Sequence, residues 1–481
     1  MTSEFNADWK NWIKTNIDNG QDKNGIFKIL LDEGYAYDAI CKEMNFTPSI
    51  PTMLLVNPLK VAAQKKQVNQ VHNHGSQVDP SRLFIPNGKK CNDPTIELYC
   101  LDDFLNASEC EHLIGSIKSK LKPSGLSSYE ADESYRTSRT CELTVLNDKI
   151  VQDIDSRICK ILGIHPSYSE AIQGQYYEEG QQFKAHTDYF EQNEILTHGG
   201  EMGQRTFTCM IYLNDVEKGG ETHFTRVGAK FQPRTGMAVI WNSLNPDGST
   251  NVNTMHQALP VIKGYKAVIT KWFRSYSALP AKPSMFIKEA NEYIPNYTNT
   301  GFIKGRLPKP LFQKILAFFC ANKQGQIIET VPGDFIFNEK DKSKNSSTLI
   351  NLSAELRKEI HDLMKPLMEQ WCDKTLEPTY VYGIRIYHEQ AVLKSHRDRL
   401  ETHIISAIIN VAQEVDEDWP LEIEDNYYRT HHIILKPGDM VLYEGGRLTH
   451  GRPKAFKGKY FANIFCHFKP VDYVPRKLEG L

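Results

Sequence analysis

The order of predicted secondary structure repeats once along this chain of 481 residues. In the first cycle, a helix capped by Asn106 or Ser108 and a second helix over 147–162 precede short β-like runs such as FTCMIYLN, GMAVIW and KAVITKWF. In the second cycle, a helix over 353–371 precedes VYGIRIY, HIISAIINVA, DMVLYEG and YFANIFCHF. Helices followed by many short strands favour a helix-backed β-sandwich or jelly roll. The repeat therefore predicts two copies of one architecture.

Changes in composition predict five segments. Residues 1–56 carry apolar side chains at helical spacing and predict a small helical module, which either only packs or docks a partner. Residues 57–92 are polar and predict a linker, and the proline-containing segment 280–305 predicts a second one. The two cycles occupy 93–279 and 306–481. The expected fold class is α+β, mostly β with supporting helices, with two double-stranded β-helix (jelly-roll) domains after the helical module.

The composition argues against several classes of protein. The 57 basic and 59 acidic side chains give a net charge of −2, which favours neither a nucleic-acid partner nor a polybasic membrane binder. No apolar run reaches the roughly 18 residues of a membrane span. The N-terminus lacks the basic start and apolar stretch of a secretory signal. Ten cysteines without a CxxC pair argue against a thiolate zinc site and a disulfide framework, so we expect a cytoplasmic, reduced protein.

Two histidines and one aspartate are the strongest candidates for chemistry. His186 and Asp188 are two positions apart, so on a strand they point to the same face. His256 follows 70 positions after His186. Two imidazoles and one carboxylate form the facial triad that holds non-haem iron(II) and leaves coordination positions open. An HxD pair alone also occurs as a surface histidine beside a capping aspartate, so the motif needs support from its context.

That context comes from several motifs in a fixed order. LDDFLNASECEHLI precedes the HxD motif, QRTFTCMIYLNDVEKGGETHF and PRTGMAVIWNSLNPDGS follow it, and Tyr177, Gly180 and Phe183 lie just before it. Together, the stretch from about 98 to 276 resembles the catalytic domain of collagen-type prolyl 4-hydroxylases. The resemblance implies a dioxygenase that uses Fe²⁺, 2-oxoglutarate and O₂, with L-ascorbate as an aid. It would hydroxylate a C–H bond, by implication in a peptidyl proline, and release succinate and CO₂.

The resemblance also implies roles for individual residues. It assigns metal binding to His186, Asp188 and His256, 2-oxoglutarate binding to Lys266, and a place near the substrate mouth to Arg205. Tyr177 and Thr208 are further candidates for the 2-oxoglutarate pocket. Each of these four roles has a structural alternative. Lys266 could be an exposed strand lysine, Tyr177 a core aromatic and Thr208 a structural threonine, and Arg205 could form a surface ion pair. One position departs from the family, which usually has tryptophan directly after the lysine where this chain has Ala267. That departure predicts a different pocket shape and weakens the case for proline.

The second cycle repeats the spacing of the first. Tyr387 lies nine residues before His396, as Tyr177 lies nine before His186, and Asp398 completes an HxD motif. His450 follows 54 positions after His396, so a second iron site is predicted, with a domain used only for binding or packing as the alternative. For the 2-oxoglutarate contact there, Arg452 and Lys459 remain two open candidates.

Three other functions stay open on the sequence alone. The first is hydroxylation of a free amino acid or another small metabolite in place of a protein or peptide. The second is a degenerate oxygenase fold that only binds. The third is metal-assisted isomerisation or hydrolysis on a cupin-like barrel, which would need no O₂.

Overall fold

A computed structural model describes residues 4–18, 20, 23–33, 35–48, 83–119, 122–123, 137–143, 148–191, 194–281, 283–329, 331, 333–344 and 346–475. Most of the predicted linker 57–92 lies outside these residues, up to position 82. The α-helices are α1 Ala7–Asp18, α2 Lys23–Asp32, α3 Tyr37–Met44, α6 Ala107–Lys118, α7 Lys149–Leu162, α8 Ile195–His198, α9 Lys309–Asn322 and α10 Ala354–Cys372. Short 3₁₀ helices are η3 Pro166–Tyr168, η4 Gly200–Met202, η5 Val252–Thr254 and η6 Ala290–Tyr293.

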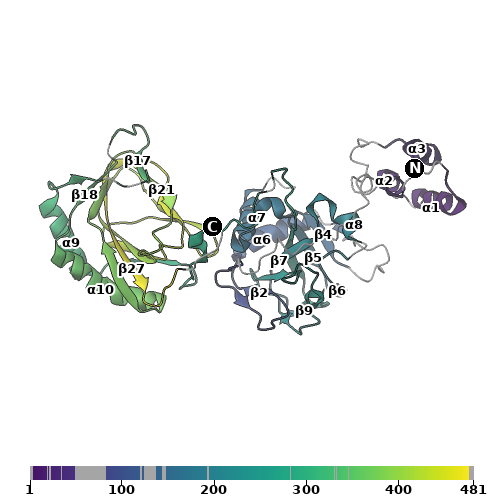
Figure 1. The fold of residues 1–481 in the computed structure, drawn as a ribbon, viewed down its shortest axis with the longest axis horizontal. Helices are drawn as coiled ribbons and strands as arrows, with labels where there is room; N and C mark the ends of the chain where they lie inside the picture. The colour runs from purple at the N-terminus through teal and green to yellow at the C-terminus, as the bar shows by residue number, and fades with distance from the viewer. Residues whose placement is uncertain are drawn as a thin grey trace.

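Helices α1 to α3 enclose a small core of their own at the N-terminus (Figure 1). Phe27, Leu30 and Ile40 are its most buried members. Helix α3 ends at Met44, and its C-cap residue Asn45 adopts a left-handed conformation with φ of 45°. The helical spacing of apolar residues in this segment therefore corresponds to three short helices.

The first sheet pair contains an eight-stranded and a four-stranded antiparallel sheet. Their strand orders are β1-β2-β11-β7-β14-β5-β4-β3 and β10-β9-β12-β6, and β8 pairs separately with β13. The strands are β1 Lys89–Lys90, β2 Leu98–Leu101, β3 Lys122–Pro123, β4 Arg139–Glu142, β5 Gln173–Tyr177, β6 Phe183–His186, β7 Arg205–Tyr212, β8 Lys218–Gly219, β9 Thr222–Phe224, β10 Lys230–Phe231, β11 Ala238–Asn242, β12 His256–Ala258, β13 Val261–Lys263 and β14 Lys266–Arg274. Strand β14 lies between β7 and β5, and every one of its residues is buried.

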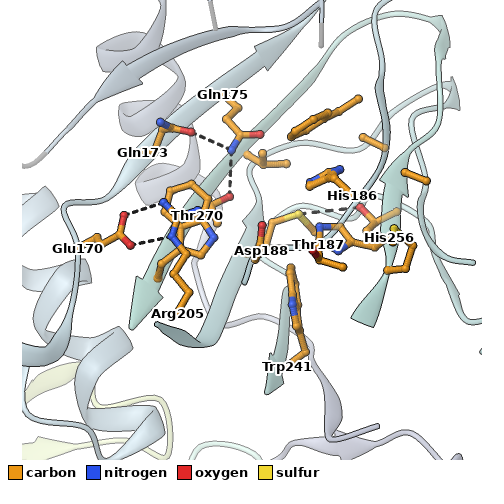
Figure 2. A pocket seen from close by; sticks show the side chains of 18 of the residues that line it. Glu170, Gln173, Gln175, His186, Thr187, Asp188, Arg205, Trp241, His256 and Thr270 are labelled. Atoms are coloured by element: carbon orange, nitrogen blue, oxygen red, sulfur yellow. Dashed lines mark hydrogen bonds and ion pairs between the residues drawn. The ribbon is translucent and has the colours of Figure 1, made fainter. Parts of the chain in front are cut away.

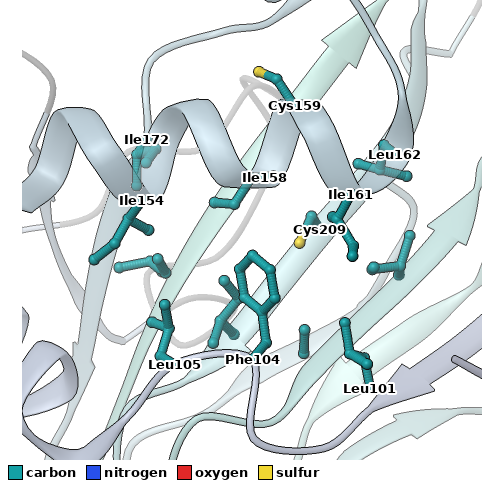
Figure 3. Close-up of a cluster of buried hydrophobic side chains, with 14 of the residues drawn as sticks. Leu101, Phe104, Leu105, Ile154, Ile158, Cys159, Ile161, Leu162, Ile172 and Cys209 are labelled. Atoms are coloured by element: carbon teal, nitrogen blue, oxygen red, sulfur yellow. The ribbon is translucent and has the colours of Figure 1, made fainter. Parts of the chain in front are cut away.

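Helices α6 and α7 pack against one face of the eight-stranded sheet. Asn106 begins α6 with a capping box, in which its side chain accepts from the backbone N–H of Glu109 at 2.9 Å. Figure 3 shows the apolar residues of α7, including Ile154 and Ile158, directed onto the sheet near Cys209. The opposite face of this sheet packs against the four-stranded sheet. The space between the two sheets therefore lies away from the helices.

The second sheet pair follows the same plan. An eight-stranded sheet has the order β15-β25-β22-β27-β20-β18-β16, with β19 also paired to β27, and a five-stranded sheet has the order β17-β21-β26-β23-β24. The strands are β15 Phe302–Arg306, β16 Ile327–Ile328, β17 Ile336–Asn338, β18 Ser347–Ile350, β19 Leu376–Val381, β20 Ile384–Tyr387, β21 Ala391–His396, β22 Ile405–Val415, β23 Leu421–Glu424, β24 Thr430–Ile433, β25 Asp439–Tyr443, β26 His450–Arg452 and β27 Gly458–Pro470. Helices α9 and α10 cover the outer face of the large sheet (Figure 1).

Helix α7 contacts the second sheet pair. Arg157 is buried and donates to the carbonyl of Tyr427 at 3.3 Å, and Lys160 pairs with Glu424 at 2.8 Å. Tyr427 and Tyr428 belong to the same buried cluster as the apolar face of α7. These contacts join the two sheet pairs through one helix and one turn.

The described chain is thus mostly β with several helices, an arrangement consistent with a jelly-roll oxygenase fold. Among the helices of the described residues, none has both the length and the apolar character that a membrane crossing requires. All ten cysteines are free thiols.

Candidate metal centre

Three side chains from two neighbouring strands converge between the sheets of the first pair. Strands β6 and β12 are antiparallel, and their register places His186 directly opposite His256. Asp188 follows the end of β6, and its side chain lies on the same side as that of His186. One nitrogen of each histidine and one oxygen of Asp188 lie within 4.8 Å of one another. Figure 2 shows these three side chains, here named the first cluster, gathered in one part of a pocket.

Both histidines of the first cluster are oriented by backbone carbonyls. Nδ1 of His186 lies 2.7 Å from the carbonyl oxygen of Lys184, and Nδ1 of His256 lies 2.9 Å from that of Thr254. A carbonyl can only accept, so each Nδ1 carries the proton and each Nε2 keeps its lone pair for a metal. The ring of His186 also stacks on Phe183, with ring centroids 3.5 Å apart. These contacts fix the two rings in the orientation that a metal ligand needs.

Asp188 is oriented by a hydroxyl from the adjoining sheet. Thr208 on β7 donates to Oδ2 of Asp188 at 2.7 Å. Burial on its own would raise the pKa of Asp188, but the His256 and His186 rings, Arg205 and the Thr208 hydroxyl hold that pKa below its ordinary value. Thr208 does not line the cavity, although the sequence predicted a contact with 2-oxoglutarate. Its hydroxyl instead contacts a metal-ligand candidate.

Replacing Thr208 with valine removes this hydrogen bond at nearly constant volume. We expect the affinity for iron(II) to fall by roughly 10- to 100-fold, because outer hydrogen bonds hold metal ligands in place. Titration with iron(II) under anaerobic conditions measures the change. Thr206→Val is the matched control, because the Thr206 hydroxyl on the same strand donates to the carbonyl of Phe273 and not to Asp188. Equal affinities for the two variants would contradict this role of Thr208.

A cavity of about 600 Å³ adjoins the first cluster. Strand β14 contributes every second residue to its lining, namely Lys266, Val268, Thr270, Trp272 and Arg274. This alternation follows from the period of two along a strand. The residues between them face the helices, and Ala267 accordingly packs in the core under α6 and α7. The departure from the family at Ala267 therefore does not reshape the cavity directly, contrary to the prediction from the sequence.

Lys266 is buried in this cavity without an acidic partner. Its side chain is 1% exposed, and its Nζ contacts the hydroxyl of Thr222 at 3.5 Å and lies over the rings of Tyr177 and Tyr212. Among the described residues, no carboxylate forms an ion pair with it. Burial lowers the pKa of Lys266 to about 7, which Glu221 partly opposes. A buried ammonium without a counter-ion is costly, so this position favours an anionic ligand.

A turn with two glycines comes just before Thr222, the residue whose hydroxyl contacts Lys266. Gly219 and Gly220 have φ of 79° and 75°, a region that favours glycine. A Cβ at Gly219 would collide with the carbonyl of Pro260. Tyr177, which pairs with Lys266 across β5 and β14, is buried and donates to the side chain of Gln175 at 2.8 Å.

Arg205 combines the two roles that the sequence left open. It lines the cavity, and it also forms a two-pronged ion pair with Glu170 at 2.7 and 2.8 Å (Figure 2). Arg274 reaches the same carboxylate at 3.0 Å. Burial would raise the pKa of Glu170, but the two guanidinium groups hold it below its ordinary value. Glu170 and Arg274 were not identified from the sequence, although Arg274 lies on the same face of β14 as Lys266.

Two tryptophans of the cavity were also missed. Trp241 and Trp272 are 1% and 8% exposed, and the indole N–H of each has no hydrogen-bond partner in the described part of the chain. The ring of Trp241 lies 4.9 Å from that of His256. Buried indole groups normally find an acceptor, so both N–H groups are available to a ligand.

A second cluster, His396, Asp398 and His450, has the same construction. Its ligand atoms also lie within 4.8 Å of one another, and the register of β21 and β26 places His396 opposite His450. Nδ1 of each histidine again lies near a carbonyl two residues earlier, at 2.8 and 2.9 Å. Asp398 accepts from the hydroxyls of Ser406 at 3.2 Å and Tyr443 at 3.0 Å. The sequence spacing thus predicted which residues meet in this half as well.

The two candidates for a cosubstrate contact in this half differ in position. Lys459 is exposed and forms an ion pair with Glu414 on the surface, so it does not face the second cluster. Lys459 follows His450 by nine positions, whereas Lys266 follows His256 by ten. A difference of one position agrees with a side chain on the outer face of the strand. Arg452 is buried two positions after His450 on β26, where it packs against Trp419 and Phe461. The prediction that Lys459 is an alternative to Arg452 is therefore wrong.

Comparisons with known proteins agree with the first cluster. The model of the 2OG-Fe(II) oxygenase superfamily matches residues 172–274, a range that contains all three side chains. Probable prolyl 4-hydroxylase 6 of Arabidopsis thaliana is 31% identical over 227 residues, which cover 42% of this chain and 76% of that protein. Probable prolyl 4-hydroxylase 8 of the same plant is 34% identical over 194 residues, or 36% of this chain and 66% of that one.

A likeness to solved structures is weaker. The viral collagen prolyl hydroxylase of Paramecium Bursaria Chlorella virus-1 is 24% identical, and the alignment covers 37% of this chain and 95% of that chain with a TM-score of 0.31. The sequence relatives carry the assignment, since one of them combines at least 30% identity with coverage of three quarters of its own length. On this ground, the chain belongs to the family of prolyl 4-hydroxylase-type dioxygenases that depend on iron(II) and 2-oxoglutarate.

Proposed function

We propose that this chain hydroxylates a C–H bond of a peptidyl proline, using iron(II) held by His186, Asp188 and His256. The observation that carries the proposal is the coexistence of the first cluster and the unpaired, buried Lys266 in one cavity. Two imidazole nitrogens and one carboxylate fit iron(II), and the lone cation fits a dicarboxylic cosubstrate. The iron, with 2-oxoglutarate and O₂, supplies the oxidising chemistry and yields succinate and CO₂.

The residues of the chain bind and orient the reactants. The ammonium of Lys266 is proposed to pair with the far carboxylate of 2-oxoglutarate, and the hydroxyl of Tyr177 to add a hydrogen bond. The indole N–H groups of Trp241 and Trp272 offer donors to carbonyl or carboxylate oxygens in the same cavity. Arg205, held in place by Glu170, is proposed to contact the peptide substrate. L-Ascorbate is expected to sustain turnover.

The domain organisation follows the same proposal. We assign the catalytic domain to 93–279 and a second oxygenase-like domain to 306–481, joined by 280–305 and preceded by the helical module and linker of 1–92. Each domain would be a double-stranded β-helix. The support is that the sheets of the first pair use strands from 89 to 274, and those of the second use strands from 302 to 470.

Succinate formation and product mass test the proposal together. The purified chain, with iron(II), ascorbate and 2-oxoglutarate in air, is incubated with proline-containing peptides and, separately, with free proline. We expect succinate to form with the peptides and the peptides to become heavier by one oxygen atom on proline. Oxidation of free proline alone would favour a small-molecule hydroxylase. If no substrate supports succinate formation, the result would favour an oxygenase fold that only binds. Turnover without O₂ would indicate an isomerase or hydrolase.

The affinity for 2-oxoglutarate should depend on pH through Lys266. Because burial lowers the pKa of Lys266 to about 7 in the ligand-free chain, the lysine is largely neutral above that pH. Binding of a carboxylate requires the ammonium, so it takes up one proton. Kd should therefore be flat below about pH 7 and rise by up to about tenfold per pH unit above it. Calorimetric titration of the metal-loaded chain measures this slope, and Lys266→Met should remove it.

A further inference from the structure

The residue equivalent to Lys266 in the second sheet pair is an aromatic. Lys266 pairs with Tyr177 across β14 and β5, and Phe461 pairs with Tyr387 across β27 and β20. Each tyrosine also precedes the first histidine of its cluster by nine residues. The register therefore places Phe461 where the first half has its buried cation.

Arg452 brings a cation from a different strand. It lies two residues after His450 on β26, so its side chain points to the same face. The corresponding position of β12 holds Ala258. The guanidinium of Arg452 lies over the rings of Trp419 and Phe461, at 4.7 and 4.5 Å, and donates to the carbonyl of Trp419. Arg452 is thus packed between two aromatic rings of the core.

These side chains close the space that the first half keeps open. Lys266 and Tyr177 line the cavity of about 600 Å³ at the first cluster. Arg452 and Tyr387 are 1% and 0% exposed, and neither lines the cavity of about 250 Å³ at the second cluster. That cavity therefore contains the candidate metal ligands without a counterpart of Lys266 on the equivalent strand, and its arginines Arg385, Arg397 and Arg399 come from other positions.

The cavity at the second cluster is instead lined by cationic and imidazole groups. Arg399 is exposed and forms no ion pair with any described residue, whereas Arg385 pairs with Glu329 at 2.7 Å. His403 is 6% exposed, and its Nε2 lacks a hydrogen-bond partner in the part of the chain that the structure describes. Its ring stacks on that of His467, with centroids 3.7 Å apart.

An adjoining cavity of about 390 Å³ extends this cationic surface. It shares Val331 and Ile336 with the cavity at the second cluster. Three lysines line it, and none of them forms an ion pair among the described residues: Lys342, Lys344 and Lys394. Asp334 and Glu329 are the acidic residues of its lining. The surface therefore has a moderate excess of positive charge, less dense than a site for a phosphate backbone needs.

We propose that His396, Asp398 and His450 form a second divalent-metal site that excludes 2-oxoglutarate and binds a carboxylate of an acidic polypeptide segment. A metal with three protein ligands keeps coordination positions open, and carboxylate oxygens are ordinary ligands for divalent ions. The cavity of about 250 Å³ leaves space for a carboxylate side chain beside the metal ligands, and the lysines of the adjoining cavity attract neighbouring acidic residues. The second half then recognises a polypeptide while the first half carries the oxygenase chemistry. This inference does not depend on the residue that the first half hydroxylates.

Metal and cosubstrate stoichiometry test the first part of the proposal. We expect the full-length chain to bind two cobalt(II) ions, Asp188→Ala one, and Asp188→Ala combined with Asp398→Asn none. Calorimetry with 2-oxoglutarate should give one site in the metal-loaded wild-type chain and none in Asp188→Ala. Near-ultraviolet circular dichroism checks that each variant is folded. One cobalt in the wild-type chain, or a 2-oxoglutarate site that survives in Asp188→Ala, would overturn the proposal.

Peptide binding tests the second part. A fluorescent oligoglutamate peptide is titrated into Asp188→Ala, with and without cobalt(II), and an oligoglutamine peptide and a single-stranded DNA of equal length serve as comparisons. We expect only the oligoglutamate peptide to bind. Its affinity should be at least tenfold lower without metal, and tenfold lower in the variant that combines Asp188→Ala with Asp398→Asn. Lys394→Ala and Arg399→Ala should each weaken it further at low salt. An oligoglutamate affinity that is the same with and without cobalt(II), a higher affinity for DNA, or no oligoglutamate binding would each contradict the assignment.

Discussion

Asp188→Ala should remove iron from the first cluster and abolish succinate formation. The carboxylate is the one anionic ligand of this cluster, and its loss leaves two neutral imidazoles to hold a divalent ion. The decrease in iron affinity should exceed the roughly 100-fold that loss of an outer hydrogen bond can cause. Elemental analysis after anaerobic loading, together with a succinate assay, measures both effects.

Asp398→Ala is the matched control for this change. It removes the equivalent carboxylate from the second cluster, which lies between the same two kinds of sheet. We expect this variant to lose the second metal ion but to keep succinate formation at the wild-type level with short proline peptides that carry no acidic segment. If Asp188→Ala kept its activity while Asp398→Ala lost it, the catalytic assignment of the two halves would be reversed.

Lys266→Met should weaken 2-oxoglutarate binding by on the order of 100-fold, with little change in iron affinity. Removal of one partner from a buried charge pair costs about 3 kcal/mol, because the other charge is left in a poorly solvated place. The substitution also removes a buried cation from the ligand-free chain, so the folded state itself should not suffer. Calorimetric titration with 2-oxoglutarate measures the effect.

Lys271→Met is the control on the same strand. Lys271 is equally buried, but it faces the other side of β14 and pairs with Asp155 at 2.6 Å. Its loss should lower thermal stability and leave the Kd for 2-oxoglutarate unchanged. Equal Kd values for Lys266→Met and the wild-type chain would remove Lys266 from the cosubstrate site.

Local periodicity explains what the sequence could predict about the site. The two-residue spacing of His186 and Asp188 is enough to place both on one side of a strand. Lys266, ten residues after His256, was assigned through the family resemblance, and β14 places it in the cavity. The same alternation on β14 would have identified Trp272 and Arg274 as cavity residues and Ala267 as a core residue.

Long-range register explains what the sequence could not predict. The family resemblance predicted that His186 and His256 meet, but their direct opposition depends on how two strands far apart in the chain align. The hydrogen bond from Thr208 to Asp188 and the ion pair of Arg205 with Glu170 depend on the same kind of alignment across 20 and 35 residues. Arg452 illustrates the point, because its packing between Trp419 and Phe461 arises from three separate strands or turns.

Anomalous diffraction is the most direct test of the central claim. Crystals of the full-length chain, grown without oxygen and with iron(II) and 2-oxoglutarate, would locate the iron by its anomalous signal. The account predicts a peak within bonding distance of Nε2 of His186, Nε2 of His256 and a carboxylate oxygen of Asp188, with 2-oxoglutarate between that peak and Lys266. A peak elsewhere with these three side chains unliganded, or a cosubstrate bound away from Lys266, would contradict it.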